Sequence, residues 1–163
     1  MNGKIKNRHR LKKKEIRALL NELEKEWSCK LFKEKNSVET GEYQGEKIIF
    51  VDNQPHFLYH NQKVFFTLHG IIAYKPTEKR VVVDMGAVGF VTKGADVMAP
   101  GIVDSDENIL EGDQVWICDE RHLKPIAVGI ALIDGFNMKS NNKGKSVQVI
   151  HYVGDMIWYL GIE

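Results

Sequence analysis

The chain has 163 residues, of which 43% are hydrophobic, with 23 Lys and Arg against 22 Asp and Glu. This length suits one large domain or two small ones, and the apolar content is sufficient for a buried core. No apolar run approaches the roughly 20 residues that a membrane helix needs, and the basic start lacks the apolar core of a secretory signal. The two cysteines, Cys29 and Cys118, have no metal-ligand spacing, which favours free thiols in a reducing compartment. We therefore expect a soluble cytoplasmic protein without a membrane anchor.

The charge is unevenly distributed along the chain. Residues 1–35 contain twelve Lys and Arg against five Asp and Glu, whereas residues 80–163 contain seven against twelve. Basic residues alternate between positions 4 and 10, a spacing that would place them on one side of an extended strand. Such a cluster favours contact with a polyanion, although a solvated helix start explains it equally well. This candidate basic face comprises Lys4, Lys6, Arg8, Arg10, Lys12, Lys13, Lys14 and Arg17.

An amphipathic helix follows the basic start. Five apolar residues recur with the helical period and therefore share one face. They are Ile16, Leu19, Leu20, Leu23 and Trp27. We expect this face to pack against the strands that come next.

Short strands alternate with turn residues after this helix. The sequence predicts strands over 47–52, 55–59 and 64–67, turns at Asn53-Gln54 and Asn61-Gln62, and a polar, turn-like segment over 38–45. A meander of these strands would pack on the helix as one layer pair. His56 and His60 lie across a strand and its turn, with no further ligand evident nearby, so we expect no metal site there.

A break in the apolar pattern over residues 74–80 predicts a boundary between two domains, residues 1–76 and residues 77–163. The second domain opens with Val81–Val83, the composition of a buried strand. Asp84 is placed to cap a short helix over 87–93.

Gly94 would end this helix, because glycine adopts the left-handed conformation without a steric cost. An apolar run over 95–98 and a Pro100-Gly101 turn follow, and residues 104–108 form an acidic loop. Further strands are predicted over 114–119, 125–133, 147–151 and 156–160, with residues 139–145 as an exposed loop. Gly129 lies inside one of these strands and indicates a bulge or a close backbone approach. About six strands and one or two short helices suit a small mixed barrel.

Enzymatic motifs are missing from the sequence. No Gly-x-Ser-x-Gly elbow or dinucleotide-binding turn is evident. Gly144-Lys145-Ser146 looks like the end of a phosphate-binding loop, but Lys139 stands where that loop needs a glycine. Asp84, Asp113 and Asp155 adjoin a glycine or a turn, where capping explains an aspartate better than acid–base chemistry. We therefore expect a protein that acts by binding, without catalytic residues, a cofactor or a metal.

Residues 94–101, GADVMAPG, resemble the helix-to-strand signature of the PUA domain, an RNA-binding fold. Further landmarks of that domain recur in order at Glu111-Gly112-Asp113, Ala127-Val128-Gly129 and Asp155–Trp158. Val83–Ala87 and Thr67–Gly70 resemble a narrower group, the archaeal relatives of the malignant T-cell-amplified sequence proteins. The resemblance implies an α+β chain in which a small α/β (pre-PUA) domain precedes a PUA pseudo-barrel of about six strands.

In PUA domains, the resemblance implies, RNA lies beside the helix and the strand that follows it. The corresponding residues are Thr92, Lys93, Gly94, Ala95, Asp96, Met98, Pro100 and Gly101. Free amides at Gly94 and Ala95 would donate to phosphate or base edges, and Lys93 would add positive charge. The family also implies the small ribosomal subunit and the acceptor end of tRNA as targets, often with a second protein related to density-regulated protein.

Three hypotheses are open at this point. The chain is an RNA-binding protein of the translation apparatus that acts in initiation or recycling, an adaptor whose acidic barrel docks a basic partner protein, or a specificity module supplied in trans to an RNA-modifying enzyme. The sequence also leaves open whether the basic N-terminal face or the acidic second domain provides most of the affinity for rRNA or tRNA.

Overall fold

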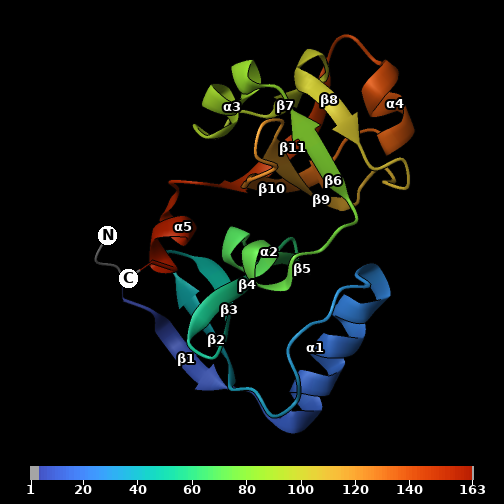
Figure 1. Ribbon diagram of the computed structural model, residues 1–163. Helices are drawn as coiled ribbons and strands as arrows, with labels where there is room; N and C mark the ends of the chain where they lie inside the picture. The colour runs from blue at the N-terminus through green and yellow to red at the C-terminus, as the bar shows by residue number, and fades with distance from the viewer. Residues whose placement is uncertain (1–3, 163) are drawn as a thin grey trace. The chain divides into compact units, whose positions relative to one another are not determined.

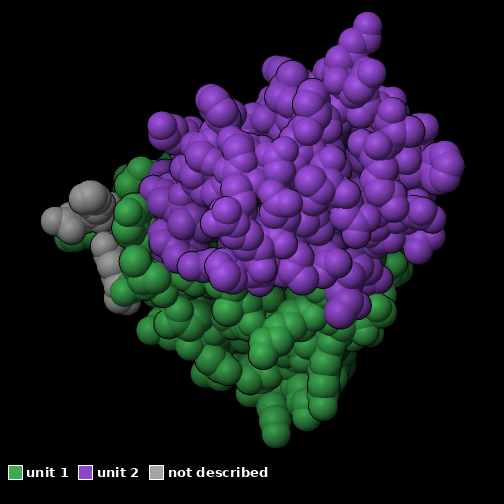
Figure 2. All heavy atoms as spheres, turned by 45° about the horizontal axis from the view of Figure 1, so that its top comes forward, with its two compact units in different colours: residues 1–76, 159–163 green, residues 77–158 purple. Residues whose placement is uncertain are grey.

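The computed structural model describes residues 4–162. The chain forms two compact units, residues 1–76 with 159–163 and residues 77–158, which are coloured separately in Figure 2. Both units contain strands and helices, as the ribbon in Figure 1 shows, so the predicted α+β class is confirmed. No helix within residues 4–162 is long and apolar enough to cross a bilayer.

The first unit is built on a five-stranded antiparallel sheet in the order β1-β2-β3-β4-β5. Successive strands are neighbours, which is the predicted meander with two more strands at its start. The turns at Asp52-Asn53 and Asn61-Gln62 have positive φ at both residues, as tight hairpins require. The strands are β1 (Lys6–Arg10), β2 (Val38–Tyr43), β3 (Glu46–Val51), β4 (Gln54–His60) and β5 (Lys63–Phe66).

Helix α1 (Lys13–Glu26) carries the predicted apolar face. Its buried residues are Ile16, Leu19 and Leu23, and Leu20 is half-buried. Trp27, just beyond the helix, is also buried and meets the ring of Phe66 edge-on at 4.7 Å between centroids. An aromatic contact of this kind adds about 0.5–1.5 kcal/mol to the burial itself.

Helix α2 (Leu68–Tyr74) packs closely on strand β4. A Cβ on Gly70 would lie 2.2 Å from the carbonyl oxygen of His56, so only glycine permits this approach. The Tyr74 hydroxyl lies 2.8 Å from His56 Nδ1. Burial, reinforced by the neighbouring His69, lowers the pKa of His56 to about 4. His56 is therefore a neutral packing residue at physiological pH.

Residues 38–43 form strand β2, so the predicted turn-like segment is wrong. Glu39, Gly41 and Glu42 are of types that strands disfavour. Pairing decides the outcome, because β2 bonds to β1 on one side and β3 on the other. The backbone hydrogen bonds of both neighbours supply what the side chains do not indicate.

The expected alternation of basic residues along β1 is also wrong. Asn7 has φ of +52°, and the register shifts between Lys6 and His9, which marks a bulge. Lys6 pairs with Glu42, whereas Arg10 pairs with Glu39. Because residues three apart on a strand point to opposite faces, the four basic residues do not share one side.

The second unit is a six-stranded mixed sheet in the order β7-β11-β10-β9-β6-β8. β6 runs parallel to β9, and the other neighbouring pairs are antiparallel. The two edge strands are joined through the three-residue 3-10 helix η1 (Ala99–Gly101), so the sheet curls on itself into a nearly closed barrel, as predicted. The strands are β6 (Arg80–Val83), β7 (Val97–Met98), β8 (Ile102–Ser105), β9 (Gln114–Asp119), β10 (Pro125–Ala131) and β11 (Lys145–Tyr152).

The barrel core is centred on β6, whose Val81 and Val83 are fully buried. A Cβ on Gly129 would lie 2.3 Å from the carbonyl oxygen of Gln148 on β11. The register between β10 and β11 also shifts at this position. The bulge and the close backbone approach predicted for Gly129 are both present.

Residues 156–160 were expected to form a strand and instead form helix α5 (Met156–Leu160). The sequence analysis also did not predict helix α2, helix α4 (Gly135–Ser140) or strand β8. Each of the three helices follows a Thr or Asp that accepts a backbone N–H three residues later: Thr67 from Gly70, Asp134 from Asn137, and Asp155 from Trp158. Helices this short have too few turns to display an apolar period.

We propose that the chain divides into two domains, residues 1–76 and 77–163, with residues 159–163 of the second packed in the first compact unit. A protease of broad specificity should then cut first within residues 75–79, which carry no helix or strand. The products should separate only under denaturing conditions. A Cβ on Gly161 would lie 2.1 Å from the ring of His69, so the end of the C-terminal fragment is held against the first unit. Full-length protein that resists cleavage in this segment would contradict the boundary.

Candidate nucleic-acid interface

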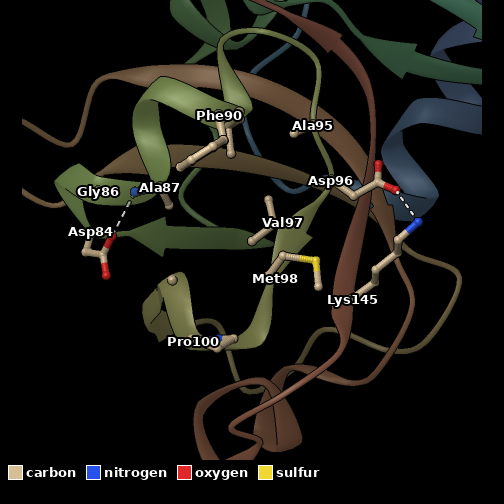
Figure 3. Close-up of a pocket in the computed structure, with 12 residues that line it drawn as sticks. Asp84, Gly86, Ala87, Phe90, Ala95, Asp96, Val97, Met98, Pro100 and Lys145 are labelled. Atoms are coloured by element: carbon tan, nitrogen blue, oxygen red, sulfur yellow. Dashed lines mark hydrogen bonds and ion pairs between the residues drawn. The ribbon is translucent and has the colours of Figure 1, made fainter.

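A pocket of about 570 Å³ opens on the surface of the second unit. It lies between helix α3 (Met85–Val91), strand β7 and helix η1, with one residue contributed by β11 (Figure 3). The lining residues are Asp84, Gly86, Ala87, Phe90, Val91, Ala95, Asp96, Val97, Met98, Pro100, Gly101 and Lys145. These elements are brought together by the fold of the barrel, since β11 follows the others by more than forty residues.

Asp84 fixes the inner end of this pocket. Its Oδ1 accepts the N–H of Ala87 at 2.9 Å, which caps α3 as predicted. Its own N–H donates to the carbonyl oxygen of Gly101 at 2.8 Å. Asp84 therefore ties the end of β6 to the start of α3 and to η1.

The pocket surface is mainly apolar. Val91 and Val97 are buried beneath it, whereas Phe90 is 68% exposed and Met98 is 46% exposed. Figure 3 shows Phe90 on α3 and Met98 on β7 on either side of the opening. Phe90 lies within the helix predicted over 87–93, and its side chain faces solvent. An aromatic ring held in solvent beside a hollow is available to a ligand.

The charged rim of the pocket is formed by Asp96 and Lys145. Lys145 Nζ lies 3.4 Å from Asp96 Oδ2, and the lysine side chain is 63% exposed. Asp96 Oδ1 accepts the N–H of Val149 at 3.0 Å, so the carboxylate is fixed to β11. The lysine is the more mobile partner, and its ammonium can reach a phosphate at the rim.

The structure brings five of the eight residues predicted from the resemblance to this pocket: Ala95, Asp96, Met98, Pro100 and Gly101. Thr92, Lys93 and Gly94 are not among the lining residues. The side chain of Lys93 is exposed, two residues before the lining residue Ala95. The Thr92 hydroxyl donates to the carbonyl of Val88 at 2.8 Å.

The amides of Gly94 and Ala95 are not free, which corrects the expectation that they donate to RNA. Gly94 N–H donates to the carbonyl of Val91 at 2.9 Å, and Ala95 N–H to that of Phe90 at 3.1 Å. Both bonds close the C-terminal turn of α3. Gly94 has φ of +93°, so its predicted role as a helix terminator is confirmed.

Sequence reasoning did not assign Phe90 or Lys145 to the site. Phe90 lay in the helix predicted over 87–93, of which only Thr92 and Lys93 were assigned to the site. Lys145 lay in a segment interpreted as an exposed loop. It reaches the pocket because β11 pairs with β7, where Lys145 is opposite Met98.

The three aspartates predicted to cap turns do so. Asp84 caps α3, and Asp113 accepts the N–H of Leu110 at 2.9 Å. Asp155 accepts the N–H groups of Tyr152 and Trp158 and lies 2.8 Å from His151 Nδ1. Burial raises the pKa of Asp155, but hydrogen bonding and the charge of His151, together with the two N–H donors, outweigh it and keep the pKa below its usual value.

Two members of the candidate basic face, Arg8 and Arg17, are in ion pairs with glutamates. Arg8 is engaged, with its guanidinium 3.0 Å from Glu39 and 4.3 Å from the centroid of the Phe50 ring. Arg17 lies 2.6 Å from Glu34 but is largely exposed. The remaining described members, Lys4, Lys6, Arg10, Lys12, Lys13 and Lys14, are all exposed.

Lys12, Lys13 and Lys14 stand at the N-terminal end of α1, with Glu15 as the acidic residue of the first turn. Cations at this end oppose the helix dipole, at a cost of about 0.3–1 kcal/mol each. Helix stability therefore does not explain them, and an anionic ligand would.

Thiol and metal chemistry find no support among the described residues. Residues 4–162 contain no group of three or more His, Cys, Asp and Glu side chains placed to hold a metal ion. Neither Cys29 nor Cys118 forms a disulfide. Burial raises the pKa of Cys118 to about 11, so its thiol is protonated and unreactive at neutral pH.

Comparison with known proteins finds a family model that matches each of the two units. The PUA domain model matches residues 79–153, so the pocket belongs to a PUA domain. The model described as a domain of unknown function, DUF1947, matches residues 7–74. An uncharacterized protein of Methanocaldococcus jannaschii is 46% identical over 156 residues, which cover 94% of this chain and 96% of the relative. The chain belongs to this family of archaeal proteins, in which a DUF1947 region precedes a PUA domain.

A solved structure and eukaryotic relatives extend the family. The crystal structure of a hypothetical protein of Pyrococcus horikoshii has a TM-score of 0.86 and 37% identity, covering 94% of this chain and 99% of that one. Translation machinery-associated protein 20 of Schizosaccharomyces pombe is 37% identical over 88 residues, 52% of this chain and 49% of the relative. Malignant T-cell-amplified sequence 1-A of Xenopus laevis is 30% identical over 81 residues, 48% of this chain and 45% of the relative. The alignments thus span about half of each eukaryotic protein.

Alanine substitutions at Gly94 and Gly89 should change protein stability in opposite directions, because Gly94 ends helix α3 and Gly89 lies inside it. Gly94→Ala should destabilise the protein by roughly 1–2 kcal/mol, because φ of +93° is strained for alanine and its Cβ would lie 2.9 Å from the Tyr152 ring. Gly89→Ala should stabilise it by about 0.5–1 kcal/mol, since this helical glycine has open space around its Cβ position. Urea unfolding of the full chain measures both changes. Equal effects of the two substitutions would contradict the assigned role of Gly94.

Proposed function

We propose that the protein is an RNA-binding component of the translation apparatus that acts in the cytoplasm without catalysis. The observation that carries the proposal is the pocket between α3, β7 and η1, which contains five of the eight residues that the PUA resemblance assigned to RNA. The targets we propose are the small ribosomal subunit and the acceptor end of tRNA, contacted during initiation or recycling.

The chemistry of the pocket suits an unpaired RNA segment. Every nucleobase has an apolar face, and the exposed side chains of Phe90 and Met98 offer a surface on which one can stack. Lys145 at the rim and Lys93 beside it can each contact a phosphate. The proposed RNA site therefore consists of the pocket together with Thr92, Lys93 and Gly94 at the end of α3.

The electrostatic attraction is proposed to come mainly from the first unit. Residues 80–163 hold seven Lys and Arg against twelve Asp and Glu, so the second unit gains little from releasing counterions. The exposed basic residues on β1 and at the start of α1 supply the opposite charge. In this arrangement the first unit attracts the polyanion and the pocket selects an unstacked base.

Names of relatives support a role in translation. The S. pombe relative is called translation machinery-associated protein 20, although the alignment spans about half of it. A partner related to density-regulated protein stays a prediction, and copurification of the two chains after coexpression would test it. A specificity module acting in trans would use the same pocket, and it differs from the translation role in that the protein would not sediment with small ribosomal subunits.

Substitutions in the pocket should weaken RNA binding at constant protein stability. Phe90→Ser should weaken binding to deacylated tRNA by roughly 1–3 kcal/mol, the usual contribution of one stacked base. Lys145→Glu should also weaken it, with an effect that shrinks as salt rises. Lys139→Glu on α4 changes the net charge equally and serves as the matched control.

These affinities are measured by filter binding of the full chain to intact tRNA and to tRNA truncated at its 3′ end. A target at the acceptor end predicts that the effect of Phe90→Ser disappears with the truncated tRNA. If Lys139→Glu weakens binding as much as Lys145→Glu, the pocket is not the RNA site.

Reversal of Lys12, Lys13 and Lys14 to glutamate should move affinity and stability in opposite directions. Acidic residues at the start of α1 complement the helix dipole, so the variant should be at least as stable as the natural protein. Its RNA affinity should fall, and the slope of log K against log salt should decrease by about 0.7–0.9 for each phosphate that the protein no longer neutralises. An unchanged slope would show that these lysines do not contact RNA.

A further inference from the structure

A second exposed apolar surface lies on the PUA domain, at helix α4. Leu110 is 66% exposed, Phe136 is 65% exposed, and Val103 on β8 is 47% exposed. The N–H of Gly135 donates to the carbonyl of Ile109 at 2.8 Å, so Leu110 and Phe136 flank one backbone hydrogen bond. The Ser105 hydroxyl donates to the carbonyl of Gly135 at 2.7 Å and holds β8 to the same point. We call Val103, Leu110 and Phe136 the α4 surface.

The fold holds these side chains outward in a fixed position. Ile109, which precedes Leu110, is fully buried in the barrel core, and so is Met138, two residues after Phe136. A Cβ on Gly135 would lie 1.9 Å from the carbonyl oxygen of Asp106, so only glycine lets the start of α4 pack this closely on the loop. A rigid apolar residue in solvent loses little conformational freedom when a ligand covers it.

Acidic side chains surround the α4 surface. Five of the ten residues 104–113 are Asp or Glu, and none is Lys or Arg. Asp106, Asp113 and Asp134 accept backbone N–H groups and shape the loop and the helix start. Glu107 and Glu111 are exposed, as is Asp104.

Lys139 lies among these carboxylates, and Lys79 and Arg80 adjoin the same loop, because Asp106 accepts the N–H of Lys79 at 2.6 Å and donates its own N–H to the carbonyl of Arg80 at 2.9 Å. Lys139 Nζ is 3.4 Å from Asp104 and 3.4 Å from Glu107, and both carboxylates raise the pKa of the lysine. These three cations face six carboxylates, so the surroundings of the α4 surface are net negative; the six are Asp104, Asp106, Glu107, Glu111, Asp113 and Asp134. RNA would be repelled there, whereas a cationic ligand would be attracted.

We propose that the α4 surface is a docking site for a basic protein segment, one that combines Lys or Arg with a large apolar side chain. Charge complementarity selects the segment, and burial of its apolar side chain against Phe136 and Leu110 anchors it. None of the residues that line the RNA pocket belongs to the α4 surface. Helices α3 and α4 lie on opposite sides of the second unit in Figure 1, so RNA and the segment can be bound together.

The two exposed phenylalanines allow a matched experiment on the full chain. The probe is a fluorescein-labelled synthetic peptide of lysines and tryptophans, compared with a peptide in which serine replaces every tryptophan. The tryptophan peptide should bind the natural protein about tenfold more tightly than the serine peptide. Phe136→Ser should abolish that difference, whereas Phe90→Ser, an equally exposed position in the RNA pocket, should leave it unchanged.

RNA binding should show the converse pattern, weakened by Phe90→Ser and unchanged by Phe136→Ser. Glu111→Lys should weaken the tryptophan peptide at low salt and provides a second variant that leaves the apolar residues in place. Equal affinity for the two peptides, or an unchanged difference in Phe136→Ser, would overturn the proposal. Self-association of the natural protein that Phe136→Ser abolishes, seen by sedimentation, would overturn it in favour of a second copy of this chain.

Discussion

The pocket of the PUA domain depends on the position of Asp84. This residue ends β6, caps α3 through Ala87 and donates its N–H to Gly101, so three segments meet at one side chain and its backbone. Because β6 lies in the middle of the barrel between β8 and β9, the buried valines before Asp84 hold it in place. The orientation of α3, and with it the exposure of Phe90, follows from this junction.

Charge is distributed unevenly between the two parts of the chain. Exposed basic residues lie on β1 and at the start of α1. The helix dipole makes the three lysines at the start of α1 unfavourable for stability. The loop before α4 is acidic, and it surrounds apolar side chains that the core does not use. A polyanion and a polycation would therefore be directed to different surfaces of one molecule. The near-zero net charge of the whole chain conceals this separation.

Elements with a distinct apolar pattern or run could be predicted from the sequence, and elements without one could not. The apolar period of α1 spans nearly four turns, and β6 and β9 have runs of β-branched or alternating residues. Helices α2, α4 and α5 have seven residues or fewer, and their one local signal is the capping Thr or Asp before each. Strand β2 has a polar sequence and exists because two neighbours pair with it. The bulge at Asn7 redirected the basic residues of β1 for the same reason, since register is a property of the pair of strands.

Local patterns of residues close together in the chain were enough to establish the α+β class, the family, the turn chemistry around Asp84 and Gly94, and five residues of the pocket. Three features came from the folded chain alone. Lys145 reaches the pocket, and the Gly94 and Ala95 N–H groups are hydrogen-bonded at the end of α3. Leu110 and Phe136 are both exposed on either side of the Gly135–Ile109 hydrogen bond. These features depend on strand pairing and on hydrogen bonds that form only when the chain is folded. A local pattern does not encode which distant segment supplies the partner.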